Sequence, residues 1–219
     1  MERNVNMEEI SDGRRYGVND MPKADCHDCE GCSKCCRGMG SSILLDPLDI
    51  FQITNGLQLS FEQLLEQGKI ELNVVDGVIL PNLKMEENRD CCGFLGQDDR
   101  CSIHPFRPGI CRIFPLGRIY ENGTFEYFLQ TGECRHKKRT KVKVRKWIDV
   151  PDVKRNQKFI GDWHYLVKDI AKILQTYDEG TAKKVSMYIL NTFYVLPYEA
   201  EGDFYSQFYE RYDKIKAVL

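Results

Sequence analysis

The chain has 219 residues, of which 42% are hydrophobic and 29% charged, and its formal net charge is −2. This balance excludes an intrinsically disordered chain, which would be poor in apolar residues and strongly charged. The length allows one well-packed core or one core with a small metal-stapled lobe, so we expect no more than two units.

The first 24 residues are polar and lack the basic start and apolar stretch of a secretory signal. We therefore expect residues 1–24 to form a polar, mobile N-terminal arm and the protein to be cytoplasmic. The most apolar later stretch, Val185 to Leu196, spans about twelve residues. A membrane span requires roughly 20, so none is expected.

Five cysteines lie close together between residues 26 and 36, and charged residues stand between them. They are Cys26, Cys29, Cys32, Cys35 and Cys36. Consecutive CxxC steps let thiolates converge on one centre, because the short backbone loops curl around the sulfurs. In a reducing compartment such thiols stay free for metals, so this segment predicts a metal site.

Two short helices are expected after this segment. The first begins at Pro47, with Asp46 as its N-cap, and runs to Ile53, with Gly56 closing it. The second runs over 61–67, after a capping box of serine and glutamine.

Two β-hairpins are predicted by two-residue turns between alternating apolar segments. The first joins 70–75 to 78–83 through an Asp-Gly pair, and the second joins 117–120 to 125–129 through an Asn-Gly pair. Such pairs favour the tight turns that match the twist of antiparallel strands.

The second cysteine group lies between residues 91 and 134. It comprises Cys91, Cys92, Cys101, Cys111 and Cys134. Since no cysteine follows residue 134, the metal chemistry is expected to end there.

Residues 135–146 hold eight Lys and Arg residues and no acidic residue. One interpretation is a solvated edge strand, because the run over 141–145 alternates and edge strands favour lysine. The other is a docking site for an acidic protein or for nucleic acid. Nucleic acid is disfavoured because aromatic residues do not interleave with the basic ones.

The hydrophobic period changes to that of a helix after Pro151. An apolar stripe is formed by Ile160, Trp163, Val167, Ile170 and Leu174. A second helix is expected from residue 181 to about 195, and a third from 203 to the C-terminus, with Phe204, Phe208, Tyr212 and Ile215 inward.

The predicted fold class is therefore α+β. It combines a small cysteine-rich metal-binding lobe of short hairpins and short helices with a C-terminal bundle of about three helices. The predicted divisions are an arm over 1–24, a cysteine-cluster domain over 25–148 and a helical region over 149–219 packed on it.

The cysteine pattern resembles the CxxCxxCC family of zinc- or iron-chelating domain proteins, also called YkgJ-like. The resemblance lies in the Cys29 to Cys36 motif, the Cys92-x-Phe94-Leu95 step, Cys101, the Arg107-Pro108 pair and the Cys111 to Pro115 motif. It implies a metal-chelating domain over roughly residues 29–134. One branch, the flagellin lysine N-methylases, is similar in its cysteine segments and implies an iron–sulfur cluster and S-adenosylmethionine.

Eight thiols match the family type, with Cys26 and Cys91 as possible additional ligands. The eight predicted ligands are Cys29, Cys32, Cys35, Cys36, Cys92, Cys101, Cys111 and Cys134. Arg112, Arg107 and His104 are expected around the ligands, where arginines can donate to sulfur or neutralise its charge. His104 is a candidate zinc ligand that we disfavour, since a hydrogen-bonded structural histidine explains it as well.

Both iron–sulfur clusters and zinc accept four thiolates, and spacing does not separate them. Adjacent cysteine pairs favour an iron–sulfur cluster, preferably [4Fe–4S], or two centres, because neighbouring side chains are expected to point to different centres. The predicted function is thus redox or methyl-transfer-like modification of a protein or peptide. The alternative is a zinc-stapled interaction module or metal carrier, and whether the protein is an enzyme stays open.

Overall fold

The computed structural model describes residues 7–26, 32–134, 136 and 138–218. The chain divides into two compact units, each made of two separate segments. The cysteine unit comprises 1–39 and 85–161, and the helical unit comprises 40–84 and 162–219. Every cysteine of the sequence belongs to the cysteine unit. The domain boundaries that the sequence predicts after residues 24 and 148 remain predictions. Within the described ranges, no helix is long and apolar enough to cross a membrane.

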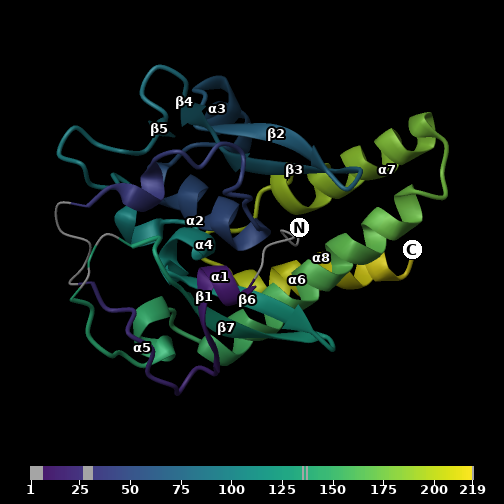
Figure 1. Ribbon diagram of the computed structural model, residues 1–219. Helices are drawn as coiled ribbons and strands as arrows, with labels where there is room; N and C mark the ends of the chain where they lie inside the picture. Colours follow the sequence, from purple (N-terminus) through teal and green to yellow (C-terminus); the bar gives the residue numbers. More distant parts are fainter. Residues whose placement is uncertain (1–6, 27–31, 135, 137, 219) are drawn as a thin grey trace. The chain divides into compact units, whose positions relative to one another are not determined.

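The cysteine unit is built on a three-stranded antiparallel sheet in the order β1-β7-β6 (Figure 1). Its strands are β1 (Ser11–Tyr16), β6 (Leu116–Glu121) and β7 (Thr124–Gln130). Between β6 and β7, Asn122 and Gly123 take positive φ angles of 50° and 78°, as a hairpin turn of this length demands. The second predicted hairpin is confirmed.

Strand β1 lies within residues 1–24, where we expected a mobile arm. Residues 11–16 pair with β7, after a short helix α1 (Met7–Ile10). Arg15 holds this edge strand across the sheet: its Nη1 and Nη2 donate to the Glu121 carboxylate at 2.6 and 2.8 Å, and Nη1 also donates to Glu126 at 3.3 Å. A polar strand is tolerated here because an edge strand exposes most of its side chains.

The Arg15 pair predicts how the stability of this sheet depends on pH. Arg15 lowers the pKa of Glu121, so the paired carboxylate stabilises the folded state above the ordinary glutamate pKa, and this contribution disappears as the pH falls through the lowered value. Glu121→Gln should lower Tm at neutral pH, and the gap to the wild type should close in acid. Glu133→Gln, at an exposed position, is the control and should show no gap at either pH.

Gly117 in β6 lies directly opposite Phe128 in β7. A Cβ atom at this position would lie 2.3 Å from Cε1 and Cζ of the Phe128 ring. Gly117→Ala should therefore reduce the free energy of unfolding by about 1–3 kcal/mol, because the ring must leave its packed position. In a Phe128→Leu background the cost should shrink, whereas Gly161→Ala, with only Gly123 O at 3.8 Å, should cost nothing.

The basic segment is not the edge strand expected over 141–145. Its chain is extended up to Lys143, and helix α5 (Val144–Ile148) begins within the alternating run. Trp147 explains the change, because its Nε1–H donates to the carbonyls of Ile113 and Phe114 at 3.1 and 3.2 Å.

The helical unit begins with two capped helices and a hairpin. Helices α2 (Pro47–Leu57) and α3 (Phe61–Glu66) both start with capping boxes. Helix α2 ends four residues later than predicted, because Gly56 stays helical and Gln58 takes the left-handed conformation that ends it. Strands β2 (Ile70–Val75) and β3 (Val78–Leu83) form the first predicted hairpin, which is confirmed in its register.

Three long helical segments complete this unit. They are the second half of α6 (Val153–Leu174), then α7 (Glu179–Leu190) continued by a π-helix η4 (Asn191–Val195), and α8 (Phe204–Lys216). The predicted apolar stripe of α6 is buried throughout, and α8 buries Phe204, Phe208 and Ile215, with Tyr212 half-buried. An aromatic cluster joins them: Trp163 lies 4.9 Å from Phe193 and 6.2 Å from Phe208 between ring centroids. The α+β class is confirmed.

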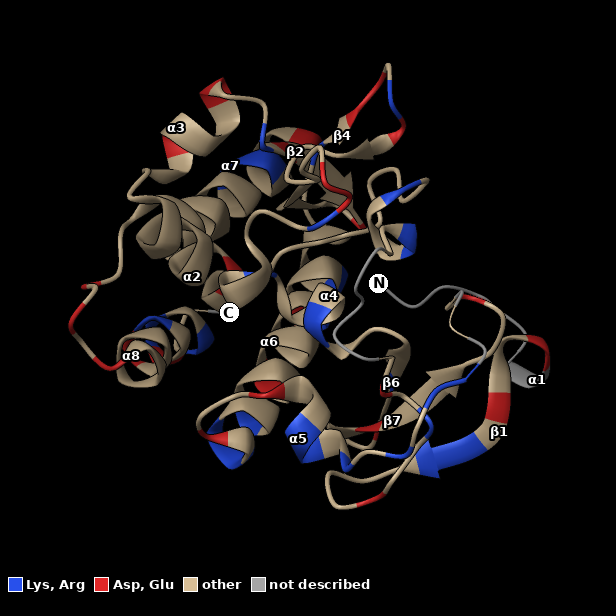
Figure 2. Cartoon of the chain, turned by 90° about the vertical axis from the view of Figure 1, so that its left-hand side faces the viewer, with Lys and Arg blue, Asp and Glu red and all other residues tan. Residues whose placement is uncertain are grey.

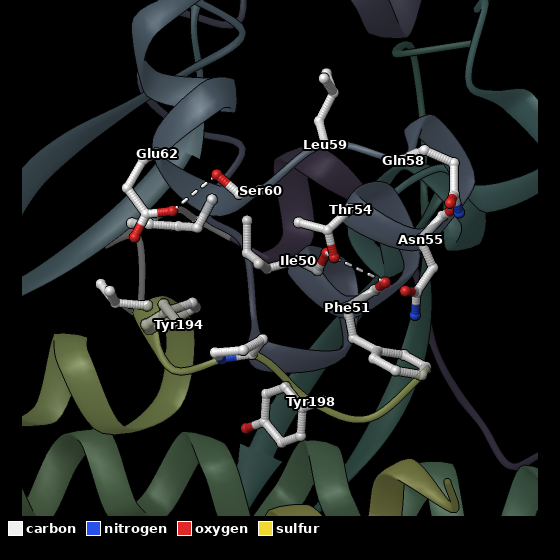
Figure 3. Close-up of a pocket in the computed structure, with 13 residues that line it drawn as sticks. Ile50, Phe51, Thr54, Asn55, Gln58, Leu59, Ser60, Glu62, Tyr194 and Tyr198 are labelled. Atoms are coloured by element: carbon white, nitrogen blue, oxygen red, sulfur yellow. Dashed lines mark hydrogen bonds between the residues drawn. The ribbon is translucent and has the colours of Figure 1, made fainter. Parts of the chain in front are cut away.

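A cavity of about 400 Å³ lies within the helical unit, between the α2–α3 connection and η4 (Figure 3). Its lining includes the rings of Phe51, Phe61, Tyr194 and Tyr198, with Glu62 as the one charged residue. The Tyr194 hydroxyl is satisfied by the Leu45 carbonyl at 2.9 Å, which anchors η4 to the segment before α2.

Candidate metal centre

Two predicted ligands, Cys35 and Cys36, lie in a single 3₁₀ turn, η2 (Lys34–Cys36). The Cys36 amide donates to the Ser33 carbonyl at 2.9 Å, which closes the turn. This tight backbone brings the sulfurs of Cys35 and Cys36 to within 3.9 Å of each other. Adjacent cysteines can therefore face the same centre, contrary to what their adjacency in sequence suggests.

A short hairpin supplies the next two cysteines. Strands β4 (Met85–Glu86) and β5 (Cys91–Cys92) pair in antiparallel fashion, and Arg37, directly after η2, bridges to Cys91. The Gly38 amide donates to the Asp90 carbonyl at 3.0 Å. The backbone thus fastens the first cysteine segment to the second, and Cys91 and Cys92 are buried at 0% and 5% exposure.

Cys101 reaches this hairpin through a tight loop over residues 93–100. Leu95 and Cys101 form a backbone bridge, and the Ser102 amide donates to the Phe94 carbonyl at 2.8 Å. Backbone N–H groups also face sulfur: Phe94 donates to Cys92 and Ile103 donates to Cys101. Such bonds stabilise a thiolate and are typical of the loops that present cysteine to a metal.

The sulfurs of Cys35, Cys36, Cys92 and Cys101 lie near enough to shift one another's ionisation. The hydrogen bond with Cys35 and then burial raise the pKa of Cys36, and Cys101 and Cys92 raise it further. Burial raises the pKa of Cys92 to about 11, and the same cause raises the pKa of Cys101. A cation at this cluster would relieve the repulsion among the thiolates.

Two arginines stand at the cluster. Arg37 donates through Nε to the Ser33 hydroxyl at 3.0 Å and through Nη2 to Asp99 at 2.7 Å, so it clamps η2 to the 93–100 loop. The hydrogen bond to Asp99 is the main cause that raises the pKa of Arg37, and the sulfurs of Cys91 and Cys36 raise it further. Arg107 partly offsets the burial that raises the pKa of Cys101. Both guanidinium groups therefore oppose the negative charge that the sulfurs concentrate.

His104 and Arg112 make protein contacts of their own. His104, in the 3₁₀ turn η3 (His104–Phe106), shares a hydrogen bond between its Nε2 and Arg107 Nη1. Arginine has no acceptor, so Nε2 accepts and is unavailable to a metal. Arg112, in helix α4 (Gly109–Ile113), donates from Nη2 to the Pro105 carbonyl at 2.9 Å and ties α4 to that turn.

Among the predicted ligands, the sulfurs of Cys35 and Cys36 are in contact, and Cys92 and Cys101 lie near enough to raise the pKa of Cys36. Cys26 is buried at 1% exposure, while Cys32, Cys111 and Cys134 are half-buried. Cys29 lies outside the described residues. In the part of the chain that is described, no three His, Cys, Asp or Glu side chains already converge to hold a metal ion.

The donor set fits a metal bound through thiolates. The four grouped donors are all sulfur, two of them receive N–H hydrogen bonds, and two arginines lie close by. Soft thiolate donors suit zinc or iron and not magnesium, calcium or manganese. When bound, such an ion supplies folding energy and, for iron, electron transfer.

An α+β unit with a bipartite cysteine cluster defines a class of small, metal-binding cysteine-rich domains. The family model named CxxCxxCC, described as a "Putative zinc- or iron-chelating domain", matches residues 28–146, more than half of the chain. The chain belongs to the CxxCxxCC family. No curated protein and no solved structure matches it significantly. None of these comparisons supports the resemblance to flagellin lysine N-methylases.

Two features of this site were not predicted from the sequence. Asp99 is 62 residues from Arg37 in the chain, and no local pattern indicates the pair. The N–H···S bonds of Phe94 and Ile103 are backbone features, for which the only signal is the short spacing between Cys92 and Cys101.

Proposed function

We propose that the cysteine unit is a four-thiolate metal-binding module in which Cys35, Cys36, Cys92 and Cys101 hold one zinc or iron ion. The remaining predicted ligands, Cys29, Cys32, Cys111 and Cys134, would serve a second centre.

The distance between the Cys35 and Cys36 sulfurs carries this proposal. Two thiolates on one tetrahedral ion, each about 2.3 Å from the metal, lie about 3.8 Å apart. The observed 3.9 Å agrees with that value. A [4Fe–4S] cluster takes one protein thiolate per iron from four cysteines, so it would separate these two sulfurs further.

Metal and acid-labile sulfide analysis of anaerobically purified protein tests the proposal. We expect zinc or iron without stoichiometric sulfide, and Cys36→Ser should lose one equivalent of metal. Cys26→Ser is the control, because Cys26 is a buried thiol of this unit that is not among the four proposed ligands, whereas Cys36 is half-buried. Metal retained in full by Cys36→Ser would contradict the assignment.

The second candidate is an iron–sulfur cluster that serves redox or methyl-transfer-like chemistry on a protein or peptide, with S-adenosylmethionine as a possible cosubstrate. Its support is the number of thiols, since ten cysteines exceed what one ion needs. Sulfide equal to iron in the anaerobic protein, with visible cluster absorption, would favour this candidate over the first.

A further inference from the structure

The basic segment of the cysteine unit is held in a defined shape. The amides of Thr140, Val142 and Val144 donate to the carbonyls of Asp25, Pro22 and Asp20 at 3.2 Å or less. The extended chain over 138–143 therefore lies along residues 18–25, and Figure 1 shows the two segments side by side near α5. The lysines of this stretch are carried on an ordered backbone.

Within the described residues, the opposite edge of this stretch has no backbone partner. The amides of Thr140, Val142 and Val144 donate to the 18–25 segment. The amides of Lys141 and Lys143, which lie between them, donate to no residue of the described chain. Lys141 and Lys143 are exposed, Val142 between them is half-buried, and Val144 is buried.

The two units also differ in charge. The cysteine unit carries 22 Lys and Arg against 18 Asp and Glu, and the helical unit carries 9 against 15. Figure 2 shows Lys and Arg concentrated on α5 and β1 of the cysteine unit. Residues 138–148 contain no acidic side chain, so nothing within the stretch neutralises it.

We propose that residues 140–143 are a docking edge for an extended acidic segment of a protein partner, which adds as a strand and places carboxylates opposite Lys141 and Lys143. In extended chain, alternate residues are about 6.7 Å apart on one face. A partner strand with acidic residues at every second position has the same spacing, and opposite charges across paired strands attract.

A protein strand fits this edge better than nucleic acid does. Single-stranded nucleic acid is held largely by stacking of bases on aromatic rings. The stretch over 138–146 has no aromatic residue, and the indole N–H of Trp147 is already bound to the end of α4. Unpaired backbone amides, by contrast, are what an added strand uses.

Fluorescence anisotropy on the full, metal-loaded chain tests the proposal with two labelled peptides of identical composition. One carries glutamates at alternate positions, and the other carries them consecutively. We expect the alternating peptide to bind at least threefold more tightly, and Lys141→Gln/Lys143→Gln to weaken it about three- to tenfold. Lys183→Gln/Lys184→Gln removes two exposed lysines of the helical unit and should leave binding unchanged.

Lys141→Pro separates backbone pairing from charge. The Lys141 amide takes no part in the bonds to 18–25, so proline should leave the fold intact, which an unchanged Tm verifies. Proline should weaken the alternating peptide more than Lys141→Gln does. Equal binding of the two peptides, equal effects of proline and glutamine, or tighter binding of a single-stranded oligonucleotide would each overturn the proposal.

Discussion

Removal of metal from the anaerobically purified protein is expected to unfold the cysteine unit in large part. The cysteines of this unit come from two segments, 1–39 and 85–161, which are separated in the chain by residues 40–84. A metal ion bound by both segments would close this long loop, so its binding energy would contribute to folding. Structural zinc sites contribute about 10 kcal/mol or more in small peptides, which exceeds the stability of most domains.

Differential scanning calorimetry with and without chelator measures this effect. The metal-loaded protein should show a transition that disappears or moves to much lower temperature after chelation, and that returns when metal is added back. The Cys26→Ser variant should behave like the wild type. A melting curve that chelation leaves unchanged would show that the metal is not structural.

Phe208→Ala should produce the largest loss of stability in the helical unit. Phe208 is fully buried, and its ring lies 5.6 Å from that of Phe193 and 5.8 Å from that of Tyr212. Truncation leaves a cavity among aromatic side chains that cannot collapse into it, so we expect a loss of about 3–5 kcal/mol in the free energy of unfolding.

Urea denaturation followed by tryptophan fluorescence reports this change, because Trp163 contacts Phe208. Tyr188→Ala is the control: it also removes an aromatic ring from the helical segments, but Tyr188 is 55% exposed. It should cost well under 1 kcal/mol. Similar losses for both variants would mean that the cluster around Phe208 is not the core of the unit.

Local chemistry made much of this fold predictable. The Asp-Gly and Asn-Gly turns placed both hairpins, and the caps at Asp46 and Ser60 placed the starts of α2 and α3. These signals act within a few residues, so they survive whatever the rest of the chain does.

Features that depend on distant partners were not predictable. Strand β1 is a polar segment whose order depends on backbone pairing with β7 and on Glu121, more than 100 residues away. Helix α5 interrupts an alternating basic run because of a bond to α4. The sequence contains both ends of each contact, but no local pattern joins them.

In the candidate metal site, too, local motifs were predictable and contacts with distant residues were not. The cysteine motifs indicated metal binding and the family. The contact between the Cys35 and Cys36 sulfurs was not predicted, because it depends on the 3₁₀ turn, which the Arg37 clamp to Asp99 holds. On that contact we base the proposal of a single ion in place of the [4Fe–4S] cluster that the sequence favours.

X-ray absorption at the metal edge of the anaerobically purified protein tests the central claim most directly. A single ion held by Cys35, Cys36, Cys92 and Cys101 predicts about four sulfur neighbours at about 2.3 Å and no second metal atom nearby. A short metal–metal distance would contradict this account in favour of a cluster. A shell made mainly of nitrogen or oxygen would show that these thiols do not hold the metal.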